Sequence, residues 1–100
     1  MTMVSDNLII EDYDLDNPII LCNIAQYYEL IKKDYELMKK YYLLSIDNSD
    51  TLAMYSLGSY YEDNDKYDEM KKYYLLAIDK GNPNSMYNLG SYYKKYRKRL

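Results

Sequence analysis

The sequence predicts an all-α protein, a short α-solenoid of antiparallel helix pairs with about two and a half repeats and a period of 32 residues. Three observations support this prediction: a long internal repeat, apolar residues at helical spacing, and helix-start signals at matching places. The predicted organisation is an acidic N-terminal leader, residues 1–16, followed by a helical repeat domain, residues 17–100. The repeat units lie near residues 17–49, 50–81 and 82–100.

The internal repeat is clearest between residues 41–61 and residues 73–93. These segments read YYLLSIDNSDTLAMYSLGSYY and YYLLAIDKGNPNSMYNLGSYY, and 13 of their 21 positions are identical. A weaker copy, residues 25–42, matches residues 58–74 with one extra residue in the turn. Self-similarity at this period is typical of stacked helical hairpins, so the repeat determines the expected architecture.

Each unit contains two stretches with apolar or small residues at helical spacing. The first stretches have them at i, i+3, i+4 and i+7: Leu21, Ile24, Ala25 and Tyr28, then Met54, Leu57, Gly58 and Tyr61, then Met86, Leu89, Gly90 and Tyr93. The second stretches place on one face Tyr35, Met38, Tyr42 and Ser45, then Tyr67, Met70, Tyr74 and Ala77. The expected helices therefore span residues 18–31, 35–47, 51–62, 66–80 and 83–98.

Helix-start signals stand at matching places in the three units. An Asn or Asp side chain can accept a hydrogen bond from the first free amides of a helix, and Pro suits the first helical position. The pairs that fit are Asn17-Pro18, Asp50-Thr51 and Asn82-Pro83, which lie 33 and then 32 residues apart. The other expected signals are Asp34 and Asp65, as caps of the second helices, and Gly81, as a left-handed stop.

Gly58 and Gly90 fall inside predicted helices, at the same place in two units. Glycine in a helix interior costs about 1 kcal/mol relative to alanine, so its recurrence indicates a packing reason. We expect the missing Cβ to let the second helix of a unit lie close against the first. The third unit has a first helix only, which we expect to bury Leu89 and Tyr93 against residues 66–80.

The residues of the two clearest copies resemble the tetratricopeptide repeat, over roughly residues 18–93. The matching positions are Leu57, Gly58, Tyr61, Tyr74 and Ala77, and then Leu89, Gly90 and Tyr93. The spelling M-Y-x-L-G-x-Y-Y is closer to the Sel-one-like subclass, and it is similar to Tyr- and Asn-rich Sel-like proteins of giant DNA viruses of amoebae. The resemblance implies a protein- or peptide-binding scaffold, in which first helices line a concave surface.

The face of each first helix that lies outside the core would line this groove. Tyr and small hydroxyl residues suit such a surface, because Tyr supplies contact area at low entropic cost. The candidate groove residues are Ile19, Cys22, Gln26, Leu52, Tyr55, Ser59, Asn84, Tyr87, Ser91 and Lys94. The alternatives are a merely solvated face and self-association through Leu52 and Tyr55.

A basic tail follows, made of Lys94, Lys95, Arg97, Lys98 and Arg99. It could bind phosphates, act as a nuclear import signal, or stack Tyr96 on single-stranded bases. It could also complement the dipole of the last helix, or pair with the acidic leader of another molecule. We do not expect nucleic-acid binding, because this is one short patch on a chain of net charge −3.

Catalysis has little support in the sequence. There is no His, no glycine-rich phosphate loop and a single Cys, so we expect no catalytic residues, no metal site, no cofactor and no internal disulfide. No apolar run is long enough for a membrane helix and no secretory signal is present, so we expect an intracellular, cytoplasmic protein, in the host cell if it is viral. A degenerate repeat fragment without a dedicated partner remains an alternative.

The acidic leader leaves two possibilities open. Residues 1–16 are either disordered or partly ordered over the apolar flank of the first helix. We favour partial order, because the segment contains apolar residues that could cover this flank: Leu8, Ile9, Ile10, Tyr13 and Leu15.

Overall fold

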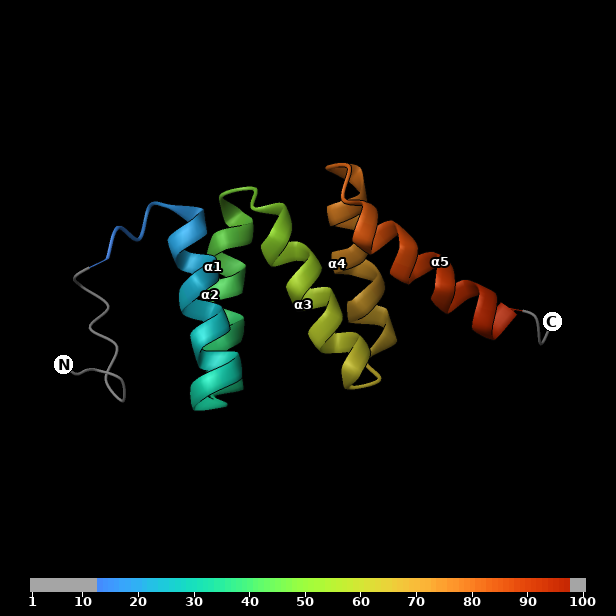
Figure 1. The fold of residues 1–100 in the computed structure, drawn as a ribbon, viewed down its shortest axis with the longest axis horizontal. Coiled ribbons are helices and arrows are strands. Elements are labelled where there is room, and N and C mark those ends of the chain that lie inside the picture. Colours follow the sequence, from blue (N-terminus) through green and yellow to red (C-terminus); the bar gives the residue numbers. More distant parts are fainter. Residues whose placement is uncertain (1–12, 98–100) are drawn as a thin grey trace. The chain divides into compact units, whose positions relative to one another are not determined.

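A computed structural model describes residues 13–97 of the chain, with side chains up to Tyr96, and this region is all-helical (Figure 1). Its helices are α1 (Pro18–Tyr27), η2 (Tyr28–Lys32), α2 (Tyr35–Asp47), α3 (Thr51–Asp63), α4 (Tyr67–Asp79) and α5 (Pro83–Arg97). The all-α prediction is therefore confirmed, and the expected helix bounds agree to within a few residues. None of these helices combines the length and the apolar character that crossing a membrane requires.

The chain divides between Asp50 and Thr51 into two compact halves. The N-terminal half contains α1, η2 and α2, and the C-terminal half contains α3, α4 and α5. Within each half, successive helices pack against each other.

Two of the three predicted caps of first helices are confirmed, those by Asn17 and Asn82. The Asn17 side chain accepts a hydrogen bond from the backbone N–H of Ile19 at 2.9 Å, and a Pro follows at the first helical position. The Asn82 side chain likewise accepts from the N–H of Ser85 at 2.7 Å. Gly81 has φ +84°, the left-handed conformation expected of a helix stop.

Of the two predicted caps of second helices, one is right and one is wrong. Asp34 caps α2 by accepting from the backbone N–H three residues on, at 3.2 Å. Asp65 does not cap α4, because Lys66 stands at the cap position and makes no side-chain bond there. The two loops read Lys33-Asp34 and Asp65-Lys66, so the acid of the second loop falls on the left-handed residue (φ 59°) and accepts from the Tyr67 hydroxyl instead.

The extra residue in the first repeat is accommodated by a π-helical turn, η2. The Asp34 N–H donates to the carbonyl of Tyr28 at 2.9 Å, and the Lys66 N–H donates to the equivalent carbonyl of Tyr61 at 2.9 Å. The first of these bonds spans one residue more than the second. A wider helical turn is the usual way in which a helix absorbs a single inserted residue.

The two helix pairs make the same contacts at equivalent positions. The Tyr42 hydroxyl donates to Glu29 Oε1 at 2.7 Å in the N-terminal half, and the Tyr74 hydroxyl donates to Glu62 Oε1 at 2.7 Å in the C-terminal half. Stacked rings recur as well, with centroids 5.9 Å apart in both pairs: Tyr28 on Tyr41, and Tyr61 on Tyr73. The repeat in the sequence therefore corresponds to a repeated pattern of contacts.

The core of the C-terminal half contains Met70, Tyr74 and Leu89. The expected burial of Leu89 on α4 is confirmed. The expected burial of Tyr93 is wrong, because its side chain is 37% exposed and Tyr92 packs against this core instead. The expected close approach at glycine is confirmed for Gly58, which lies against Tyr74, but it is wrong for Gly90, around which the described residues leave open space.

Candidate partner-binding surface

The structure places seven of the ten predicted groove residues on two helices of the C-terminal half. We call this surface the α3–α5 face, and it consists of Leu52, Tyr55 and Ser59 on α3 and of Asn84, Tyr87, Ser91 and Lys94 on α5. Two large apolar side chains project from it, since Leu52 is 50% and Tyr87 75% exposed. Tyr55 is half-buried and its ring stacks on Tyr74, with centroids 6.0 Å apart, so Tyr55 also supports the fold.

A polar network joins the three helices at this face. The hydroxyl of Tyr74 on α4 donates to Glu62 of α3 and accepts from Asn88 Nδ2 of α5 at 3.2 Å. Burial, followed by the hydrogen bond to Glu62, raises the pKa of Tyr74, so the phenol stays neutral at physiological pH. Asn88 was not among the predicted residues. It lies outside the apolar stripe, and the equivalent residue 32 positions earlier is Ser56, so the repeat does not single it out.

A cavity of about 290 Å³ opens where the C-terminal ends of α3 and α5 meet the start of α4. The residues that line it are Glu62, Asp65, Tyr67, Ser91, Tyr92, Lys95 and Tyr96. Of these, only Ser91 and Lys95 belong to predicted sites. The remaining residues of this lining were not predicted as site residues. For Tyr92 the reason is that the sequence shows the doublet Tyr92-Tyr93 but not which of the two rings enters the core.

Three tyrosines form one wall of this cavity. Ring centroids lie 5.0 Å apart for Tyr67 and Tyr92, 4.8 Å for Tyr92 and Tyr96, and 5.8 Å for Tyr67 and Tyr96. The Tyr67 hydroxyl lies 3.3 Å from that of Tyr96 and donates to Asp65 at 3.0 Å. Hydrogen bonds to Tyr96 and then to Asp65 are the main causes that raise the pKa of Tyr67.

The three predicted groove residues of the N-terminal half differ in their surroundings. Ile19 is exposed and Gln26 is half-buried. Cys22 is only 1% exposed, so its prediction as a groove residue is wrong. Burial, followed by the charge of Asp50, raises the pKa of its thiol to about 12. It is therefore a buried small side chain without thiolate reactivity.

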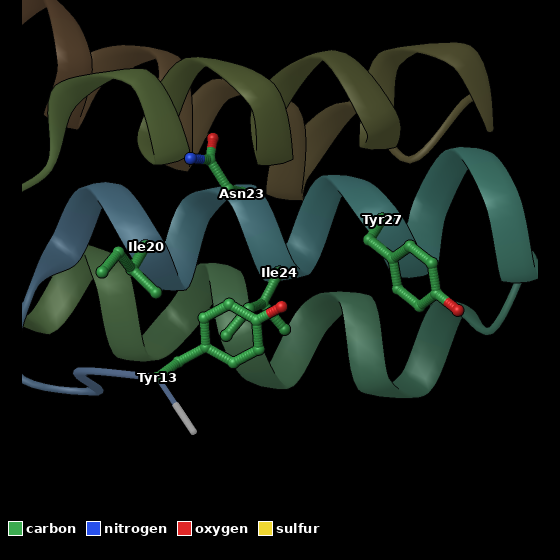
Figure 2. Close-up of a pocket in the computed structure, with 5 residues that line it drawn as sticks. All are labelled: Tyr13, Ile20, Asn23, Ile24 and Tyr27. Atoms are coloured by element: carbon green, nitrogen blue, oxygen red, sulfur yellow. The ribbon is translucent and has the colours of Figure 1, made fainter. Parts of the chain in front are cut away.

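A second cavity, of about 240 Å³, lies on the flank of α1 (Figure 2). Tyr13, Ile20, Asn23, Ile24 and Tyr27 line it, and the figure shows the Tyr13 ring beside Ile24. The alternative that the leader covers this flank is thus correct for Tyr13. Leu8, Ile9 and Ile10 lie outside the described residues.

The basic tail is described only in part. Lys94 and Lys95 are exposed near the end of α5, whereas Lys98, Arg99 and the side chain of Arg97 lie outside the described region. Tyr96 packs against Tyr67 and Tyr92, and the Lys95 ammonium lies 5.4 Å from its ring centroid. Tyr96 is therefore not free to stack on a nucleic-acid base without breaking this cluster.

No group of three or more potential metal ligands occurs among the residues from Tyr13 to Arg97. No family model, curated protein or solved structure matches the chain. The C-terminal half thus offers two exposed apolar side chains beside a polar network, a polar-aromatic cavity at one end, and basic side chains at the rim of that cavity.

Proposed function

We propose that the protein is a scaffold or adaptor that binds a protein or peptide through the α3–α5 face. The observation that carries this proposal is the exposure of Tyr87, which presents three quarters of a large amphipathic side chain to solvent at the centre of its helix face. Exposed aromatic anchors surrounded by small polar residues are typical of protein-binding surfaces. Ser59, Asn84 and Ser91 supply such polar neighbours on the same face.

The recurring contacts of the two helix pairs support a finer proposal for the architecture. We propose that the chain is a short α-solenoid of the tetratricopeptide kind, close to the Sel-one-like subclass, in which first helices line one continuous surface.

The face fits a peptide that offers apolar side chains and backbone hydrogen-bonding groups. Leu52 and Tyr87 supply apolar contact area, while Asn84, Ser91 and Lys94 supply donors. Glu62 already accepts from Tyr74, so its carboxylate is engaged by the fold. We therefore expect the peptide backbone, rather than a charged terminus, to provide most of the polar contacts.

A peptide selection tests this proposal. Peptides selected from a random display library on the wild-type chain are measured by calorimetry against wild type and Tyr87→Ser. Loss of a well-packed aromatic anchor costs about 2 kcal/mol, so we expect affinity to fall roughly thirtyfold. Because Tyr87 is exposed, circular dichroism and melting of the variant should match the wild type.

Leu75→Ser is the matched control, because Leu75 is a comparably exposed apolar residue on α4, outside the α3–α5 face. We expect this variant to bind like the wild type. Equal losses in both variants would show nonspecific hydrophobic binding, and unchanged affinity in Tyr87→Ser would rule out the α3–α5 face. A selection that yields no specific peptide would favour a degenerate repeat fragment.

A further inference from the structure

A second surface lies on α5, on the neighbouring side of the helix from the α3–α5 face. We call it the open face of α5 and define it by Met86, Gly90 and Tyr93, which are the apolar stripe predicted for this helix without Leu89. Met86 is 54% and Tyr93 37% exposed, and no atom of the described residues lies within 4 Å of a Cβ built on Gly90.

The equivalent stripe on α3 shows what covers such a face. It consists of Met54, Gly58 and Tyr61, each 32 residues earlier, and α4 covers it. Met54 is 4% exposed, the Tyr74 ring lies directly on Gly58, and Tyr61 stacks on Tyr73. An antiparallel helix therefore fills the side of α3 that corresponds to the open face of α5 (Figure 1).

The same arrangement occurs in the N-terminal half. There the stripe is Leu21, Ala25 and Tyr28, all packed toward α2, and Tyr28 stacks on Tyr41. Twice in this chain, then, the stripe of a first helix is covered by a following helix with tyrosines near its middle. On α5 the stripe keeps its apolar residues, but the described part of the chain supplies no helix for it.

The charges on α5 indicate that a helix covering it would differ from α2 and α4 in the polar groups that it offers. At the edge of the stripe, α1–η2 and α3 carry Glu29 and Glu62, and each accepts a hydrogen bond from a tyrosine of the covering helix. The equivalent residue on α5 is Lys94, which can only donate. The segment from Pro83 to Arg97 contains no Asp or Glu at all, and Lys94 and Lys95 are exposed.

From this geometry we propose that the open face of α5 is a docking site for an acidic amphipathic helix supplied by a partner protein. The partner helix lies antiparallel to α5, as α4 lies on α3. Its apolar stripe covers Met86 and Tyr93, its residue at the place of Tyr74 lies over Gly90, and a carboxylate on that residue takes the place of the tyrosine hydroxyl opposite Lys94. This surface has its own apolar residues and its own occupant, and it shares only Lys94, at its edge, with the α3–α5 face.

Gly90→Ala gives the sharpest test, because it acts on the fold and on docking in opposite directions. A methyl group at the equivalent Gly58 would clash with the Tyr74 ring, so a methyl group at Gly90 should obstruct a docked helix. In the free protein the methyl meets open space, and Ala favours the helix. We expect a more stable protein that binds an unaltered peptide of residues 66–80, whose Tyr74 ring would meet this methyl group, at least about tenfold more weakly than the wild type does, in line with an overpacked contact.

The probe is a synthetic fluorescent peptide with the sequence of residues 66–80 and Tyr74→Glu, which places a carboxylate opposite Lys94. Its matched control carries Tyr74→Lys. Titrated by anisotropy with the full chain at low salt, the Glu peptide should bind about fivefold more tightly than the Lys peptide, as expected for one exposed ion pair. The variant Lys94→Glu should reverse this preference.

Three results would overturn the proposal. The first is equal affinity of wild type and Gly90→Ala for the unaltered peptide of residues 66–80. The second is a peptide preference that Lys94→Glu leaves unchanged. The third is a concentration-dependent dimer of the wild type, seen by sedimentation and abolished by Gly90→Ala, which would show that a second copy occupies the face. Tyr87→Ser should leave probe binding intact, which separates this site from the α3–α5 face.

Discussion

The ring of Tyr74 occupies the space that a side chain on Gly58 would need. A Cβ built on Gly58 would lie 2.6 Å from Cδ1 and 2.8 Å from Cε1 of this ring. The ring cannot easily withdraw, because Tyr74 is fully buried and its hydroxyl is held by Glu62 and Asn88. One contact between a missing side chain and an aromatic ring thus sets how closely α3 and α4 approach.

Gly58→Ala should therefore destabilise the protein although alanine favours helices. Overpacking a core costs about 1–3 kcal/mol, and the gain in helix propensity is about 1 kcal/mol, so we expect a net loss of up to about 2 kcal/mol. Urea unfolding followed by circular dichroism measures the change. Gly90→Ala is the control and should gain up to about 1 kcal/mol. Equal effects at both glycines would contradict the packing role of Gly58.

The loop before α4 reads Asp65-Lys66, whereas the loop before α2 reads Lys33-Asp34. Lys66 therefore occupies the N-cap position of α4 without capping the helix. Lys66→Ser should stabilise α4 by about 1 kcal/mol relative to Lys66→Ala, because the hydroxyl can accept from the free amides of the first turn. Asp34→Ala should destabilise α2 by about the same amount, because it removes an existing cap. Unfolding free energies in urea would show both effects. A Ser variant no more stable than the Ala variant would refute the prediction.

Two buried serines should respond in opposite ways to replacement by alanine. The Ser45 hydroxyl lies 2.7 Å from the Pro18 carbonyl and 2.8 Å from Asp50 Oδ2, so Ser45→Ala removes the single proton that one of these part-buried acceptors receives. Ser85 is equally buried, but its hydroxyl has no hydrogen-bond partner among the described residues. We expect Ser45→Ala to cost roughly 1–2 kcal/mol and Ser85→Ala to gain about 1 kcal/mol.

Thermal and urea unfolding of these two variants are compared under identical conditions. Ala53, the equivalent of Ser85 on α3, is completely buried, which shows that an alanine fits this position of the repeat. A loss of stability in Ser85→Ala would indicate that its hydroxyl has a partner.

Alkaline pH should weaken the protein through Tyr74. Its folded pKa is raised above 10, chiefly by burial and by the bond to Glu62. The unfolded chain then loses this proton first, so the stability contributed by Tyr74 is complete below pH 10 and declines as the pH rises through the folded pKa. The advantage of wild type over Tyr74→Phe in urea unfolding should shrink between pH 9 and pH 11. A constant or growing advantage would contradict the sign of this shift.

The sequence by itself determined the local structure of the chain. Apolar spacing gave the helices, and Asn17, Asn82, Asp34 and Gly81 gave their ends, because these effects depend on residues within one or two turns. The same reasoning misplaced Asp65, since the acid and the Lys stand in opposite order in the two loops and the left-handed residue comes directly before the cap in both. The sequence shows the extra residue of the first repeat. It does not show that a π-helical turn absorbs this residue, because that turn depends on packing between two helices.

Only the tertiary structure decided which residues of each helix face solvent. Cys22 and Tyr87 stand at equivalent positions of the repeat, yet Cys22 is buried and Tyr87 exposed. Gly58 and Gly90 share one motif, yet only Gly58 meets a ring. A side chain at a given position of a helix is buried only if another helix lies beside it. The repeated sequence determines where a residue lies on its helix. The tertiary structure determines whether another helix lies beside that residue.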